Sequence, residues 1–81
     1  MGLIILEGWK VGLEKVTLTK LQMNLLKIPL VDSKSNVDKL LDGEVIIIKE
    51  SEDTLARLFI RKATEIGVIC YYLDSMINRK E

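Results

Sequence analysis

The chain has 81 residues, a formal net charge of zero, 30% charged residues and 48% hydrophobic residues. These values are typical of a single folded domain with a small core, and they exclude a disordered chain. Because the chain is neutral, it lacks the bulk positive charge with which proteins bind nucleic acids or anionic membranes. We therefore expect neither partner.

Two features bear on the compartment. The chain has one cysteine, Cys70, so no internal disulfide can form, which favours a reducing environment. The apolar run Leu3–Leu6 is much too short for the core of a signal peptide or for a membrane span. We expect a cytoplasmic protein.

The first half of the chain predicts a strand and two helices. The apolar run Leu3–Leu6 predicts the strand, and a loop containing two glycines follows it. Val16–Lys27 has helical spacing, and Pro29 separates it from a second helix at Leu30–Asp42. Gly43 is suited to end the second helix in the left-handed conformation.

The second half predicts two strands around a third helix. The β-branched run Glu44–Lys49 predicts a strand, and Ser51 is the expected N-cap of the helix that follows. Gly67 ends that helix, and Val68–Leu73 predicts the last strand. The remaining residues, Asp74–Glu81, form a polar C-terminal tail.

The predicted order is therefore β-α-α-β-α-β. Three strands can form one sheet with the three helices on one face. We expect a fold of the α+β class, a two-layer sandwich with a three-stranded sheet. Residues 1–81 then form a single domain, with a core at about residues 3–73.

The first predicted helix has two apolar stripes. Leu18, Leu21 and Leu25 share the face that we expect to pack on the sheet. A second, narrower stripe either packs inside the helical layer or forms the floor of a docking groove with a lysine rim. The stripe is Val16, Thr19 and Met23, and the rim is Lys15, Lys20, Lys27 and Lys34.

Lys34 stands at the edge of the apolar arc of the second helix. One interpretation is that its methylene groups lie along the core while its ammonium group stays in water. The other is that it contacts a partner. Asp38, one turn later, has the spacing of an ion-pair partner.

Four short motifs follow one another between residues 3 and 73. They are EKVTLTK at Glu14–Lys20, LVDSKSNVD at Leu30–Asp38, Lys49-Glu50, and EIGV at Glu65–Val68. Together they resemble the C-terminal domain of the bacterial ribosomal stalk protein. That family has Asn-Lys-Val-x-x-x-Lys, Leu-x-x-Ala-Lys-x-x-Val-Asp/Glu, Lys-Glu and Glu-Ala-Gly-Ala at the corresponding places. In the second motif, Ser33 replaces the alanine.

The resemblance implies a protein partner. In the stalk family the first two helices present lysines and apolar residues to translational GTPases. The positions matched here are Lys15, Val16, Lys20 and Lys34. Thr19, Met23 and Val31 stand where the family has isoleucine, arginine and lysine, which weakens the expectation of a GTPase in particular. The stalk protein's N-terminal dimerisation domain and hinge have no counterpart in this chain.

The same fold occurs in the adaptor that delivers N-degron substrates to the Clp protease. That adaptor has an Asn-Asp-Asp turn and a pocket histidine, and this chain has neither. We therefore expect no N-degron binding.

Catalytic patterns are absent from the sequence. Without histidine, no Cys/His metal cluster or histidine-activated nucleophile is possible, and Cys70 is expected to be a buried, inert thiol. We expect no enzyme, metal or cofactor, but a protein-interaction module. Its partner-binding residues are Lys15, Val16, Thr19, Lys20, Met23 and Lys34. The alternatives are a homo-oligomeric structural or regulatory protein and a non-catalytic subunit of an enzyme.

The strands predict a second surface. A sheet with helices on one face and water on the other should alternate apolar and polar residues, but LIIL, VIII and VICYYL do not. If Val68, Cys70 and Tyr72 face the helices, an apolar set consisting of Ile69, Tyr71 and Leu73 faces outward. We expect a homodimer packed sheet against sheet. Alternatively, Trp9 or the tail, through Met76 and Ile77, covers this face.

Overall fold

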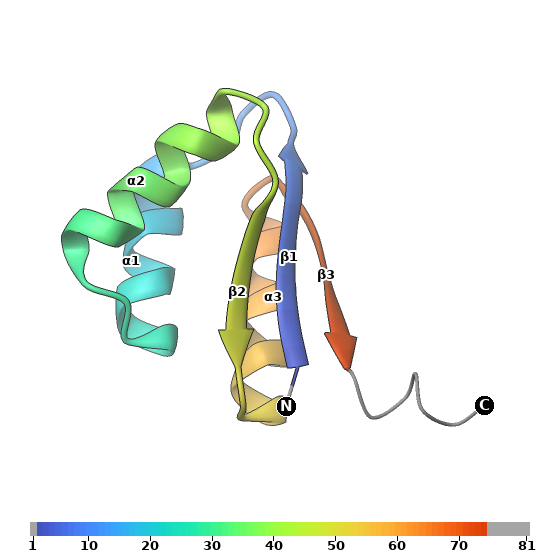
Figure 1. Ribbon diagram of the computed structural model, residues 1–81. Coiled ribbons are helices and arrows are strands. Elements are labelled where there is room, and N and C mark those ends of the chain that lie inside the picture. The colour runs from blue at the N-terminus through green and yellow to red at the C-terminus, as the bar shows by residue number, and fades with distance from the viewer. Residues whose placement is uncertain (1, 75–81) are drawn as a thin grey trace.

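The computed structural model of the protein describes residues 2–74 (Figure 1). The elements are β1 (Gly2–Trp9), α1 (Lys15–Leu26), α2 (Leu30–Leu41), β2 (Ile46–Glu50), α3 (Asp53–Glu65) and β3 (Val68–Asp74). The predicted α+β class and the order β-α-α-β-α-β are confirmed. Asp74 is the last residue of β3 and not the start of a tail. The rest of the predicted tail, with Met76 and Ile77, lies outside the described residues.

The sheet has the strand order β2-β1-β3, and β1 is antiparallel to both neighbours. Ile5 in this central strand lies opposite Ile47 on one side and Tyr71 on the other. The pairing of β1 with β3 shifts in register just after Leu6, as in a β-bulge. This shift lets β1 continue beyond Leu6, its predicted end, to Trp9.

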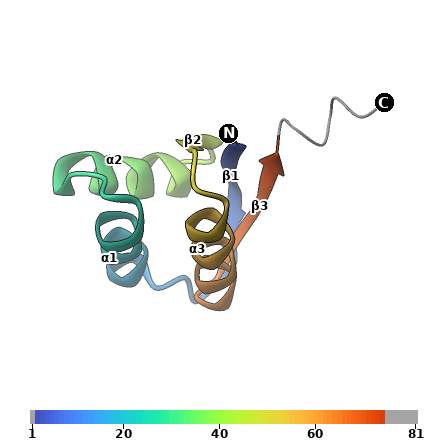
Figure 2. The same cartoon turned by 90° about the horizontal axis from the view of Figure 1, so that it is seen from below.

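The helices form the second layer of the sandwich. α3 lies along the sheet, behind it in Figure 1, and the α1–α2 pair extends the layer beyond β2 (Figures 1 and 2). α2 crosses α1 and contacts β1 and β2, whereas α1 packs mainly on the other two helices. None of the described elements covers the opposite face of the sheet, which points toward the viewer in Figure 1.

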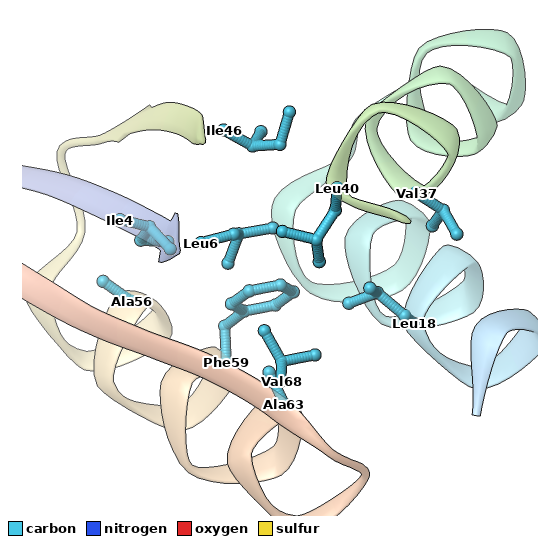
Figure 3. Packing of buried hydrophobic residues seen from close by; sticks show 10 residues of the cluster. All are labelled: Ile4, Leu6, Leu18, Val37, Leu40, Ile46, Ala56, Phe59, Ala63 and Val68. Atoms are coloured by element: carbon cyan, nitrogen blue, oxygen red, sulfur yellow. The ribbon is translucent and has the colours of Figure 1, made fainter. Parts of the chain in front are cut away.

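The core lies where α3 meets the sheet and the helical pair. The fully buried ring of Phe59 lies between Leu6 and Val68, with Leu40 of α2 above it (Figure 3). Ala56 and Ala63, one turn away on either side of Phe59, are small enough to let α3 approach the strands closely. The buried apolar residues are Ile4, Leu6, Leu18, Val37, Leu40, Ile46, Ala56, Phe59, Ala63 and Val68.

The predicted buried face of α1 is partly wrong. Leu18 is fully buried, but Gln22 is the other buried residue of the helix, and Leu21 and Leu25 are only partly buried against the core. The reason is that α1 packs on α2 and α3 and not on the sheet. A helix-to-helix contact can accept a polar side chain if the neighbouring backbone and side chains supply its hydrogen bonds.

The predicted helix ends are confirmed at two glycines and wrong at two other positions. Gly43 and Gly67 have positive φ angles of 94° and 105°, as their positions after α2 and α3 predicted. Ser51 is not the N-cap of α3. The capping position is Glu52, whose amide donates to Oε2 of Glu50 at 3.0 Å. Lys27 does not belong to α1 but follows it in the left-handed conformation, with φ 58°.

Candidate partner-binding groove

Two adjoining hollows lie between α1 and α2. One has a volume of about 180 Å³ and the other about 360 Å³, and Val16, Thr19 and Lys34 line both. All six predicted partner-binding residues line one or both hollows: Lys15, Val16, Thr19, Lys20, Met23 and Lys34. We refer to the two hollows together as the α1–α2 groove.

The floor of the groove is mostly apolar. Val16 is 68% exposed and Leu30 49% exposed, while Thr19 and Met23 are half-buried. The Thr19 hydroxyl donates to the backbone carbonyl of Lys15 at 3.1 Å, so it is already satisfied within α1. Val16 is too exposed to be packed inside the helical layer, and the stripe therefore offers apolar surface to solvent.

A buried hydrogen-bond network fixes the distance between the two walls. The Gln22 side-chain amide donates to the backbone carbonyls of Leu18 at 3.3 Å and Ser33 at 3.1 Å. Its carbonyl accepts a hydrogen bond from the Asn36 amide at 2.8 Å. The Ser33 hydroxyl donates to the Ile28 carbonyl at 3.2 Å, which ties α2 to the turn after α1. α1 and α2 therefore cannot slide past each other without breaking several hydrogen bonds.

The rim of the groove is predominantly positive. Lys15 and Lys20 stand on α1 and Lys34 on α2, and all three are exposed. Asp38 is the one acidic residue that lines the groove. Within residues 2–74, Lys34 and Asp38 do not form the ion pair that their spacing allowed, since the salt bridge found there joins Arg57 to Asp53.

Some residues of the groove were missed by the sequence interpretation. Leu30 and Val37 line it from α2, Leu30 with 49% of its surface exposed and Val37 as a buried residue of the core. Lys27 had been placed on the rim but is not among the lining residues. The burial of Gln22 could have been predicted from its position, because it lies one turn after Leu18 on the buried side of α1.

The face of the sheet away from the helices is apolar, as the strand pattern predicted. Ile69, Tyr71 and Leu73 are 42%, 45% and 39% exposed. Val68, which points to the opposite side of the sheet, is buried. Trp9 does not cover this face. It lies opposite Val68 in the sheet, and paired residues project to the same side, which here is the helical side.

A second polar cluster lies at the start of α3. The Tyr72 hydroxyl and the Arg57 guanidinium both hydrogen-bond to the Asp53 carboxylate, and they lower the pKa of Asp53. The same hydrogen bond to Asp53 raises the pKa of Tyr72. Arg57 also lies over the Tyr72 ring, 5.4 Å from its centroid. The Tyr72 ring covers Gly2, where it leaves no space for a Cβ.

Cys70 is half-buried on the helical side of β3. Its sulfur lies 3.6 Å from the Thr64 hydroxyl, and burial raises the pKa of the thiol. A raised pKa leaves little thiolate at neutral pH, and the thiolate is the nucleophilic form. Among residues 2–74, no three His, Cys, Asp or Glu side chains gather in a way that could hold a metal ion.

Comparisons with protein families, curated proteins and solved structures found no match for this chain. The resemblance to the ribosomal stalk domain therefore rests on the motifs of the sequence alone. None of the helices in the described part of the chain is long and apolar enough to span a membrane.

Proposed function

We propose that the protein is a non-enzymatic interaction module that binds a protein partner in the α1–α2 groove. The observation that carries this proposal is the meeting of exposed apolar residues and lysines in one groove. Val16, Met23 and Leu30 form the floor, while Lys15, Lys20 and Lys34 stand around it. Isolated surface lysines or valines are ordinary, but their combination in a concave site is typical of partner recognition.

The chemistry of the groove defines the partner. A segment that fits would place large apolar side chains on the floor and carboxylates beside the lysines. Because the lysines are exposed, they would speed association and select the partner more than they would add affinity. A translational GTPase, which the resemblance implies, is the more specific candidate. The neutral Met23 and the exposed, apolar Val31 count against it, because that family has positive charge at both positions.

Retention of partners from the source cell tests the proposal. The immobilised protein is compared with Lys20→Glu and Lys34→Glu, and retained proteins are quantified by mass spectrometry. We expect one set of acidic partners to be lost from both variants and kept by Lys39→Glu. Lys39 is the matched control because it is an exposed lysine of α2 that does not line the groove. Partners unchanged in both groove variants would contradict the proposal.

A retained partner then needs to be placed in the groove. The chain contains three methionines, so the ¹³C-methyl spectrum is simple, and Met23→Leu identifies the resonance from the groove. We expect the purified partner to shift the Met23 methyl signal. The shift should require more partner as the salt concentration rises. A partner that binds without moving this signal would have to bind elsewhere.

A further inference from the structure

The face of the sheet that no described element covers carries three rows of side chains across the strands. The middle row is Ile47, Ile5 and Tyr71, and the row beside it is Lys49, Leu3 and Leu73. On the other side of the middle row, Ile69 lies opposite Gly8. Two charged residues stand among these rows: Lys49 at a corner, and the exposed Glu7, which precedes Gly8 in β1 and points away from the buried Leu6. Leu3, Ile5, Ile47, Ile69, Tyr71 and Leu73 are called the outer face below.

We propose that the outer face packs against the outer face of a second copy of this chain. This surface is separate from the α1–α2 groove, so the proposal does not depend on the proposed function. The resulting homodimer would leave the grooves of both copies open. Each dimer would therefore carry two accessible α1–α2 grooves.

The area of the outer face supports a dimer. Ile47 is 61% exposed, and together with the exposed parts of Ile69, Tyr71 and Leu73 it contributes on the order of 400 Å² of apolar surface per copy. A contiguous patch of this size on a soluble domain is commonly an interaction site. Two such faces would bury roughly 800 Å², below the standard interface of about 1,600 Å². The expected dimer is therefore a reversible one that forms at micromolar concentrations.

The charge pattern favours a second copy over a charged partner. Two stacked sheets keep their strands within about 30° of each other. The twofold axis that relates the two copies therefore lies in the interface, either parallel to the strands or perpendicular to them. If the axis is parallel to the strands, Lys49 lies over Leu73 of the partner copy. If the axis is perpendicular to the strands, Lys49 lies over that end of the partner copy's β2 which is nearer to Ile46. The two copies of Lys49 do not meet in either arrangement. Glu7, the other charged residue on this side, has the opposite charge, so the face has no net charge that a charged partner could complement. A twofold axis perpendicular to the strands also brings Glu7 of one copy to the row of Lys49 of the other.

Sedimentation equilibrium of the full chain, from low to high micromolar concentration, tests the proposal. We expect the mass to rise from 9.2 kDa toward twice that value. Ile47→Lys should weaken association by more than about tenfold, because it buries an unpaired charge in each copy. Val31→Lys is the matched control, since Val31 is an apolar residue of α2 with 76% exposure that lies off the outer face.

Several outcomes would overturn the proposal. A wild-type mass of 9.2 kDa at every concentration means that no second copy binds. A dimer that survives Ile47→Lys means that copies associate elsewhere, for example through the free edge of β3, which lies two strands away. Far-UV circular dichroism confirms that the variants fold. If Ile47→Lys unfolds, Ile69→Lys/Leu73→Lys on the other edge strand replaces it.

A measurement on the wild type avoids dependence on variants. A sample mixed from isotope-labelled and unlabelled chains gives nuclear Overhauser effects between copies. We expect these contacts to join side chains of the outer face, Ile47 with Tyr71 or Leu73 for example. Contacts between copies that involve only other residues would overturn the proposal even if a dimer forms.

Discussion

The contact of α3 with the sheet is apolar at its centre, whereas the contact of α1 with α2 has a hydrogen-bonded glutamine there. Phe59 fills the first contact among apolar neighbours, and Gln22 fills the second between Ser33 and Asn36. Apolar packing tolerates many arrangements of similar volume, but directed hydrogen bonds hold one relative position. The α1–α2 contact is also the one whose geometry shapes the groove.

Each contact also has a polar cluster, and the two clusters differ in burial. Gln22 is fully buried, and no buried side-chain nitrogen or oxygen among residues 2–74 lacks a hydrogen-bond partner. Asp53 and Arg57, by contrast, are exposed at the end of the α3 contact. Water can replace a lost partner in the exposed cluster but not in the buried one. A hydrogen bond in the buried cluster should therefore contribute more to stability than one in the exposed cluster.

The largest effect is expected at Phe59. Phe59→Ala removes the largest fully buried side chain and leaves a cavity between α3 and the sheet. We expect a loss of about 3–5 kcal/mol in the free energy of unfolding, measured by urea denaturation. If that variant is too unstable to measure, Phe59→Leu should cost about 1–1.5 kcal/mol. A loss well below these values would mean that the core is less tightly packed around this ring.

A smaller but more specific effect is expected at Gln22. Gln22→Leu keeps a similar volume but removes the partner of the Asn36 amide and one donor to the Ser33 carbonyl. We expect a loss of about 1–2 kcal/mol in the free energy of unfolding. The Met23 methyl resonance should also move, because α1 can then shift against α2.

The exposed Asn24 of the same helix gives the control for this change. Asn24→Leu should alter stability by less than about 0.5 kcal/mol and leave the Met23 signal in place. If Gln22→Leu proves neutral and the Met23 signal does not move, apolar packing alone positions the two helices. The contrast between the two contacts would then be wrong.

The smallest effect is expected from the exposed cluster, and it depends on pH. The folded protein lowers the pKa of Asp53 below its ordinary value of 3.8, first through Tyr72 and then through Arg57. The stabilisation is therefore complete above about pH 3.8 and is lost as the pH falls toward the lower, folded pKa, because the unfolded chain takes up the proton first. Tyr72→Phe should raise the pKa of Asp53 toward 3.8 and weaken this acid dependence.

Carboxyl ¹³C chemical shifts recorded against pH measure the titration of Asp53 directly. Arg57→Gln, which removes both the hydrogen bond and the charge of Arg57, should also raise the pKa of Asp53 toward its ordinary value. An Asp53 carboxylate that titrates at its ordinary value in the wild-type protein would show that the Tyr72 hydroxyl does not hold it.

The sequence by itself determined the class of the fold, the order of the elements and the apolar character of both sheet faces. Helical and strand periodicities are local, and residues such as Pro29 and Gly43 end their elements through their own backbone preferences. The same local patterns placed the six groove residues on the first two helices. Their apolar and basic character is a property of the residues and not of the packing.

Only the tertiary structure decided which face of α1 is buried and how the groove is formed. Gln22 lies one turn after Leu18, but its side chain is polar, and its partners on α2 become neighbours only after the two helices cross. In the same way, β1 extends to Trp9 because β3 pairs with it across a shift in register, and Lys27 adopts a left-handed turn because α2 must fold back on α1. Contacts between residues distant in the chain override local preference where burial and hydrogen bonding stabilise the alternative.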